Sequence, residues 1–393
     1  MSDAQPHFET LAIRTQLPTT AEREHSVPLF LTSSFVFESA EQARALFADE
    51  IPGNVYSRYS NPNVDELVRK LCLMEGAEDG IGTASGMAAV YVAMASLLGA
   101  GDHVLVGRSL FGSTHQILTR LFPRWGIAHT YADFGEPDAW PGLLRPDTKL
   151  IFVETPSNPG LDLVDLEWLG GLARDRGIPL IVDNCFSTPY LQKPIGYGAD
   201  LVVHSATKYL DGQGRSLGGV IVGGSKLVAE ARFFARHTGP ALSPFNAWVL
   251  SKSLETLAVR MDRHCANALA LARRLEDHPE LELVKYPFLP SHPQHELACR
   301  QMRQGGGVLV LVVKGGYERA RRFLDAVRLM SHSPNLGDTR TIVTHPASTT
   351  HSKLTEDERQ RVGIVPGLVR IAAGLEHVDD LVADVERALA ASR

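Results

Sequence analysis

The clearest candidate for chemistry is a lysine that directly follows an apolar run. Lys208 ends the segment His204-Ser205-Ala206-Thr207-Lys208, where the run DLVVH (200–204) stops. A lysine amine held at such a place can bond covalently to a carbonyl group, and the hydroxyls of Ser205 and Thr207 can donate to a phosphate. The alternative is an ordinary solvated loop lysine, because most lysines in proteins are exposed.

Two further groups stand at comparable places in the chain. Asp183 ends the run IPLIVD (178–183), where a buried carboxylate would face a ligand, although a helix or turn cap is the simpler interpretation. Ser85 and Gly86 open the apolar stretch TASGMAAVYVAMASL, and the free N–H groups of a helix start attract anions. Alone, that stretch is better interpreted as an N-cap serine followed by a packing glycine.

The combination is more specific than its parts. A helix start suited to phosphate, an aspartate at one strand end and Ser-x-Thr-Lys about 25 residues further on are the groups that pyridoxal phosphate (PLP) requires. The aspartate keeps the pyridine nitrogen protonated, which makes the ring an electron sink. A nicotinamide oxidoreductase would instead show G-x-G-x-x-G after an early strand, and this chain has no such fingerprint opening a helix.

The elements that must position these groups alternate along the chain. Short apolar runs at 103–106, 149–154, 178–183 and 200–204 are separated by amphipathic stretches such as DLEWLGGLARDRG. This alternation predicts a parallel sheet covered by helices on both faces, with ligands beyond the carboxyl ends of the strands. We therefore expect an N-terminal arm over 1–60 and a cofactor-binding domain over 61–250. A smaller α+β domain is expected over 251–393, where one long helical stretch is followed by GGGVLVLVVKGG and LVRIAAG.

Composition narrows the classes of protein. The 393 residues carry a net charge of −6 without a basic stripe, which argues against a nucleic-acid partner. No secretory leader or membrane span is expected from the polar start and the short apolar runs. The four widely spaced cysteines and scattered histidines favour reduced thiols, no metal site and a cytoplasmic protein.

At these residues the chain resembles the Cys/Met-metabolism family of PLP-dependent enzymes, which includes cystathionine γ-synthase, the cystathionine lyases, methionine γ-lyase and the homoserine-ester sulfhydrylases. The resemblance runs from about residue 10 to the C-terminus. The motifs that carry it are YSRYSNPN (56–63), TASGM (83–87), VETPSNP (153–159), VDN (182–184), HSATKY (204–209), HPASTTH (345–351) and LVRIAAGLE (368–376). The fold it implies is α/β, with an aspartate-aminotransferase-like (fold type I) large domain whose sheet is mostly parallel, and a smaller α+β C-terminal domain.

The resemblance also implies a role for individual residues. Lys208 would hold the cofactor covalently and then move protons, and Asp183 would pair with the pyridinium nitrogen. Arg370 would clamp the substrate α-carboxylate, for which a guanidinium is a natural bidentate partner. The remaining implied cofactor contacts are Gly86, Met87, Ser205 and Thr207 at the phosphate, Asn158 near the phenolic oxygen, and Tyr56 and Arg58 reaching the phosphate of a neighbouring subunit. The contact of Tyr56 and Arg58 with a neighbouring subunit implies a dimer, and the resemblance implies a homotetramer built from two such dimers.

Two positions depart from the family pattern. Phe111 stands where many relatives carry a tyrosine stacked on the cofactor, so the ring is retained but the hydroxyl is lost, which counts against a lyase. Asn335 stands where several relatives place a serine beside the substrate carboxylate, and asparagine can still donate a hydrogen bond.

The loop KYLDGQGRSLGG (208–219), together with FGST and NLGDT, is most similar to the O-succinylhomoserine sulfhydrylase branch of the family. The implied reaction is γ-replacement, in which O-succinylhomoserine and sulfide give homocysteine and succinate, and Arg108 and Arg215 are candidate cations for the succinyl group. Cystathionine γ-synthase, which uses cysteine, and O-acetylhomoserine sulfhydrylase remain alternatives. A non-catalytic PLP-fold binding protein is the alternative from a different class.

Overall fold

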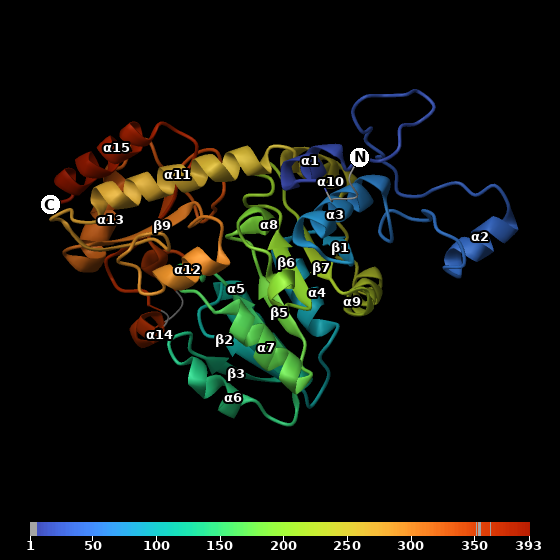
Figure 1. Cartoon of the computed structure of the whole chain (residues 1–393), viewed down its shortest axis with the longest axis horizontal. Coiled ribbons are helices and arrows are strands. Elements are labelled where there is room, and N and C mark those ends of the chain that lie inside the picture. Colours follow the sequence, from blue (N-terminus) through green and yellow to red (C-terminus); the bar gives the residue numbers. More distant parts are fainter. Residues whose placement is uncertain (1–5, 351, 353–354, 362) are drawn as a thin grey trace.

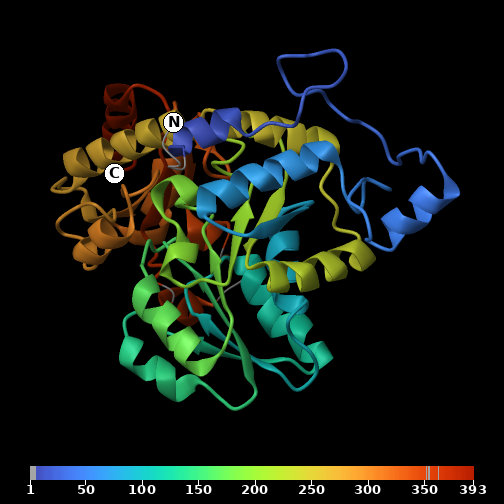
Figure 2. The same cartoon turned by 45° about the vertical axis from the view of Figure 1, so that its right-hand side comes forward.

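The computed structural model describes residues 6–350, 352, 355–361 and 363–393. The first five residues of the arm and the last histidine of the motif at 345–351 lie outside this part. Its elements fall into two sheets with their covering helices, and an N-terminal segment that projects from the body (Figures 1 and 2).

The larger sheet has seven strands among the described residues, in the order β1-β7-β6-β5-β4-β2-β3. Every neighbouring pair is parallel except those made by β7, which is antiparallel to β1 and β6. The sheet is therefore mostly parallel, as the apolar runs predict. The strands are β1 (Asp79–Thr83), β2 (His103–Gly107), β3 (Ala128–Ala132), β4 (Thr148–Glu154), β5 (Leu180–Asp183), β6 (Leu201–Ser205) and β7 (Gly219–Gly223).

Both faces of this sheet are buried, and successive residues of a strand contribute to different cores. In β4, Ile151 and Val153 pack with one group of helices, and Leu150 and Phe152 pack with the other. The first face is covered by α3 (Pro62–Glu75), α7 (Leu166–Arg176), α8 (Thr188–Leu191) and α10 (Pro244–Leu254). The second is covered by α4 (Gly86–Ala95), α9 (Ser225–Thr238) and the helical turns that follow α5 (Gly112–Gln116).

The smaller sheet has five strands among the described residues, in the order β10-β11-β12-β9-β8. These are β8 (Leu281–Lys285), β9 (Val308–Val313), β10 (Ser331–His332), β11 (Ile342–Thr344) and β12 (Leu368–Ala372). Leu309 and Leu311 face a second core shared with α13 (Gly316–Ala326) and α15 (Val378–Ala391), whereas Val308 and Val310 join the core of the large domain. The remaining elements are α1 (Phe8–Arg14), α2 (Ala40–Phe47), α6 (Trp140–Leu143), α12 (His295–Gln301), α14 (Glu356–Arg361) and short helical turns at 117–121, 122–125, 137–139, 194–197 and 346–348.

The long helical stretch expected over 246–278 is divided in the structure. Helix α10 ends at Leu254, and α11 (Leu257–Leu275) begins after two intervening residues. At the break the carbonyl of Ser253 accepts hydrogen bonds from the Thr256 hydroxyl (3.2 Å) and from Arg260 (2.9 Å). Side chains thus satisfy the backbone groups that the break leaves without helical partners.

Helix α11 belongs to both cores. Its first half contributes Leu257 and Met261 to the core of the large domain, and its second half contributes Leu271 and Leu275 to that of the small domain. Figure 1 shows it running from the body of the large domain across the small sheet. The two domains are therefore connected by a continuous helix and not only by loops.

The N-terminal segment is less uniform than an extended arm. Helix α1 packs against α3 and α11 and buries Ala12. The part of residues 15–60 around α2 projects from the body in both views (Figures 1 and 2), whereas the N–H groups of Leu17 and Phe30 donate to side chains of α3. The boundaries at 60 and 250 stay a prediction.

Candidate active site

The carboxyl ends of three neighbouring strands bring the predicted groups together. In the parallel register, Glu154 of β4 lies opposite Asp183 of β5, and Asp183 lies opposite Val203 of β6. After β6 the chain makes a turn in which the N–H of Lys208 donates to the Ser205 carbonyl (3.2 Å). This is the edge of the sheet at which a parallel α/β fold binds its ligand.

The amine of Lys208 is held by the small domain. Its Nζ donates to Oδ1 of Asn335 at 2.5 Å, across 127 residues of sequence. Burial lowers the pKa of Lys208 and outweighs the raising effect of Cys185, and the positive charge of Arg370 lowers the pKa by a further, smaller amount. A lowered lysine pKa increases the fraction of free amine, which is the form that accepts a proton.

Two carboxyl groups face one another at the strand ends. Burial raises the pKa of Asp183 to about 6, against the hydrogen bond that its Oδ1 accepts from the N–H of Cys185 (3.0 Å). Burial and the charge of Asp183 raise the pKa of Glu154 well above its usual range. Glu154 also accepts a hydrogen bond from the N–H of Phe111 (2.9 Å), which fixes the loop carrying that ring. A cation bound between the strands would favour the ionised form of Asp183.

The start of α4 forms a cradle for an anion. The hydroxyl and carbonyl of Ser85 accept hydrogen bonds from the N–H groups of Ala88 (3.1 Å) and Ala89 (3.0 Å). The N–H groups of Gly86 and Met87 have no acceptor among the described residues and are free for a ligand. A Cβ added to Gly86 would lie 2.5 Å from the Cβ of Ser205, so only glycine allows this approach.

Ser205 and Thr207 lie on the turn beside that cradle. The hydroxyl of Thr207 is oriented by the N–H of Gly218, which donates to it at 3.2 Å. The turn and the helix start thus present backbone N–H groups and hydroxyls on one side of Lys208. Such donors suit a phosphate group.

Arg370 of β12 completes the site from the small domain. Its side chain is 2% exposed, and it donates to the Asn158 Oδ1 (3.0 Å) and to the carbonyls of Pro334 (3.2 Å) and Asn335 (2.9 Å). The Nε of Arg370 is buried without a partner among the described residues. An unpartnered donor at this place fits a substrate carboxylate, because leaving it unpaired costs free energy.

The structure therefore brings most of the predicted residues together and leaves others apart. Lys208, Asp183, Asn335, Arg370 and Asn158 lie at one edge of the sheet. Tyr56 and Arg58 are exposed beside α9, where Arg58 donates to the carbonyl of Arg236.

The two cations considered for the succinyl group are already paired. Arg108 contacts Asp133 at 2.5 Å, and Arg215 contacts Asp211 at 3.1 Å. Each guanidinium therefore already has a carboxylate partner, and a role of either residue toward the succinyl group stays a prediction.

Sequence reasoning assigned no role to Glu154. The signal was present, because this carboxylate ends an apolar run just as Asp183 does. Only the strand register shows that the two acids are neighbours. Among the described residues, no group of three or more His, Cys, Asp or Glu side chains could hold a metal ion, and no helix is long and apolar enough to cross a membrane.

These residues fit pyridoxal phosphate. An amine that can bond to the aldehyde, a carboxylate suited to the ring nitrogen and a cradle suited to the phosphate lie at one sheet edge, and a buried arginine with an unpartnered Nε lies across from them. The fold and the site define an α/β PLP-dependent enzyme with an aspartate-aminotransferase-like (fold type I) large domain.

Comparison with known proteins makes the assignment more specific. The model of the family described as Cys/Met metabolism PLP-dependent enzyme matches residues 9–390, and the chain belongs to that family. It is 52% identical over 384 residues to O-succinylhomoserine sulfhydrylase of Pseudomonas aeruginosa, covering 98% of this chain and 95% of the relative. It is 43% identical to L-methionine gamma-lyase of Pseudomonas putida, covering 93% of this chain and 92% of the relative.

A solved structure is similar over the whole chain. It is a Campylobacter jejuni protein assigned as O-acetylhomoserine (thiol)-lyase, with a TM-score of 0.93 and 35% identity, covering 98% of this chain and 99% of the other. That protein carries N′-pyridoxyl-lysine-5′-monophosphate at its position 205. The PLP dependence expected from the sequence is confirmed.

Proposed function

We propose that this chain is a transferase that replaces the γ-succinyloxy group of O-succinylhomoserine with sulfide, giving homocysteine and succinate. The observation that carries the proposal is the link from Lys208 through Asn335 to Arg370, which sets a proton-accepting amine beside a carboxylate clamp. The similarity to O-succinylhomoserine sulfhydrylases of Pseudomonas aeruginosa (52% identical) and Mycobacterium tuberculosis (44% identical) supports this substrate and this nucleophile.

Bound pyridoxal phosphate would supply an electron sink for the electrons released at the substrate α-carbon. The cradle of α4 with Ser205 and Thr207 would hold its phosphate, and the carboxylate of Asp183 would hold its ring nitrogen protonated. Lys208 would be its covalent anchor.

The chain's own residues would then orient the substrate and move its protons. Arg370 binds the α-carboxylate through its fork, and Asn158 and Asn335 hold the guanidinium in place. The Nζ of Lys208 takes the α-proton, passes it on, and only then takes a β-proton, because a neutral amine accepts one proton at a time. Protons return to the β- and α-carbons through the same amine after sulfide has replaced succinate at the γ-carbon. Its lowered pKa suits both directions of transfer.

Phe111 favours replacement over elimination. Its N–H is held by Glu154, but its ring carries no hydroxyl to donate or relay a proton. Proton movement therefore depends on Lys208.

We propose further that the enzyme acts in the cytoplasm as a homotetramer in which Tyr56 and Arg58 reach the cofactor phosphate of a neighbouring subunit. The exposure of both side chains supports this arrangement. Sedimentation of the loaded enzyme tests the oligomer, and a monomer with full activity would contradict it.

One competition assay tests the reaction. Purified enzyme with PLP and O-succinylhomoserine is given equal sulfide and cysteine, and the products are separated by chromatography. We expect mainly homocysteine, and none from Lys208→Ala. Mainly cystathionine would make the enzyme a cystathionine γ-synthase, and 2-oxobutyrate alone would make it a lyase.

A further inference from the structure

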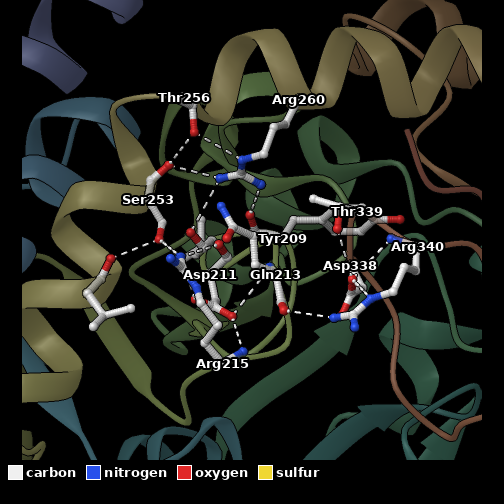
Figure 3. Close-up of polar contacts among 12 residues, drawn as sticks. Tyr209, Asp211, Gln213, Arg215, Ser253, Thr256, Arg260, Asp338, Thr339 and Arg340 are labelled. Carbon is white, nitrogen blue, oxygen red and sulfur yellow. Dashed lines mark hydrogen bonds and ion pairs between the residues drawn. The ribbon is translucent and has the colours of Figure 1, made fainter. Parts of the chain in front are cut away.

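The loop that follows the catalytic lysine is enclosed between two distant parts of the chain. This post-lysine loop comprises residues 209–215, and the segment 333–340 lies against one side of it (Figure 3). Helix α11 lies against its other side through Arg260. These contacts are not accounted for by substrate or cofactor binding.

Arg260 holds the beginning of the post-lysine loop. Its guanidinium is almost fully buried and donates to the carbonyl of Tyr209 at 2.6 Å, with a longer contact to that of Leu210 at 3.5 Å. The same side chain donates to the Ser253 carbonyl (2.9 Å) and the Thr256 hydroxyl (3.2 Å), which fixes it on the break between α10 and α11. A buried arginine that donates to several backbone carbonyls sets the path of that backbone rather than providing surface charge.

Arg340 holds the other end of the loop. It donates to the carbonyl of Gln213 (3.1 Å) and forms a two-point ion pair with Asp338, with distances of 2.9 and 3.0 Å. Asp338 is 7% exposed, whereas the side chain of Arg340 is 64% exposed. The pair therefore sits at the surface end of the enclosed loop, and Figure 3 shows Arg260 and Arg340 on different sides of Tyr209 and Gln213.

Two glycines show how closely the loop and the segment approach. A Cβ on Gly337 would lie 2.5 Å from the Tyr209 nitrogen and 2.9 Å from the Lys208 carbonyl carbon. A Cβ on Gly214 would lie 2.4 Å from Oδ2 of Asp338, and both glycines have positive φ. The stretches DGQGR and NLGDT, distant in sequence, are therefore one packing unit.

We propose that Arg260 and Arg340 are positioning residues for Lys208: Arg260 fixes the start of the post-lysine loop on the break between α10 and α11, and Arg340 fixes its end against the segment 333–340. Together they hold the lysine amine on Asn335. The segment 333–340 contacts both the proposed base and the proposed carboxylate clamp. The side chain of Asn335 accepts a hydrogen bond from Lys208, and its backbone carbonyl accepts one from Arg370. A loop held at both ends keeps the base and the carboxylate clamp in register. This inference rests on the proposed function only in its kinetic test, which measures homocysteine formation; the structural contacts do not depend on that function.

Arg340→Met is the decisive variant, because the exposed side chain can be removed without opening the core. We expect kcat for homocysteine formation to fall about 10-fold with KM changed less than about threefold, since the base is displaced but Arg370 keeps its partners. Arg340→Lys retains a donor that reaches the Gln213 carbonyl and is expected to recover most of kcat. Gly214→Ala should lower kcat similarly, because its Cβ overlaps Asp338.

Arg145→Met is the matched control. Arg145 makes the same two-point pair with an aspartate two residues away, at 2.9 and 2.5 Å to Asp147, and it lies before β4, at the opposite edge of the sheet from Lys208. It should leave kcat unchanged. Equal kcat in Arg340→Met and wild type, or an equal loss in Arg145→Met, would overturn the proposal.

Hydrogen exchange of residues 205–217 in the PLP-loaded enzyme gives a readout independent of the substrate. We expect faster exchange in Arg340→Met than in wild type and Arg145→Met, with thermal stability nearly unchanged. If hydrogen exchange of residues 205–217 is the same in Arg340→Met and wild type, the positioning role is refuted, even when the wild-type enzyme forms homocysteine. Wild-type enzyme that forms no homocysteine would refute the proposed function alone.

Discussion

Asp183→Asn should have opposite effects on the cofactor-free and the loaded enzyme. In the cofactor-free protein, the carboxylate is held at a buried strand end with a pKa raised to about 6, and asparagine removes that charge while keeping an oxygen for the N–H of Cys185. In the loaded enzyme the same carboxylate would face the pyridinium nitrogen, where its charge is an advantage.

The magnitude follows from proton linkage. The pKa is raised in the folded state, so the folded protein holds a proton that the unfolded chain has already released above about pH 4. The free energy of unfolding of the wild type therefore falls as the pH rises from about 4 to about 6. Above pH 6 the total loss is about 3 kcal/mol. Cofactor-free Asp183→Asn should exceed wild type in the free energy of unfolding by about 3 kcal/mol at pH 8 and by about half as much at pH 5.

Urea unfolding of both cofactor-free proteins at pH 5 and pH 8 measures the difference. Titration of each with PLP then measures the gain in stability on loading, which should be smaller in Asp183→Asn. A variant less stable than wild type at pH 8 without cofactor would refute the assignment of Asp183 as a buried charge awaiting a cation. An equal gain on loading would refute its pairing with the ring nitrogen.

Three other substitutions test the remaining parts of the site. Arg370→Lys should raise KM for O-succinylhomoserine about 10- to 100-fold in steady-state assays, because an ammonium cannot replace a bidentate fork; an unchanged KM would remove Arg370 from substrate binding. Gly86→Ala should weaken PLP binding at least about 10-fold in equilibrium dialysis, because its Cβ would force α4 away from Ser205; tight binding would show that the cradle is not used. Phe111→Tyr should increase the share of 2-oxobutyrate relative to homocysteine, since the hydroxyl adds a proton donor; an unchanged product ratio would show that this position does not select the reaction.

The central part of the fold was predictable because each strand carries its own signal. The apolar runs ending at Glu154, Asp183 and His204 are the strands β4, β5 and β6, and the polar residues after them meet at one edge. Strand β1 was not predicted, because two of its five residues are glycines. Those glycines admit close packing: a Cβ on Gly82 would lie 2.9 Å from a methyl carbon of Val64 in α3.

The contacts across the domains could not be derived from local pattern. The distance from Lys208 to Asn335 in sequence is 127 residues, and the joining hydrogen bond depends on how the two sheets pack. The sequence pattern around Arg260 predicts an exposed charged residue on an amphipathic helix. In the structure Arg260 is buried and donates to backbone carbonyls such as that of Tyr209. Resemblance to a family pointed to Asn335 and Arg370, but not to Arg260 or Asp338.

The membership of α11 in both cores has a consequence for how this chain unfolds. Cutting the chain after α10 would remove Leu257 and Met261 from the large core, and a fragment starting at α11 would expose those same side chains to water. Neither half would keep a complete interior, so the two domains should melt in a single cooperative transition rather than one after the other. A rigid helix common to both also restricts hinge motion between Lys208 and Arg370, which suits a site whose base and clamp belong to different sheets.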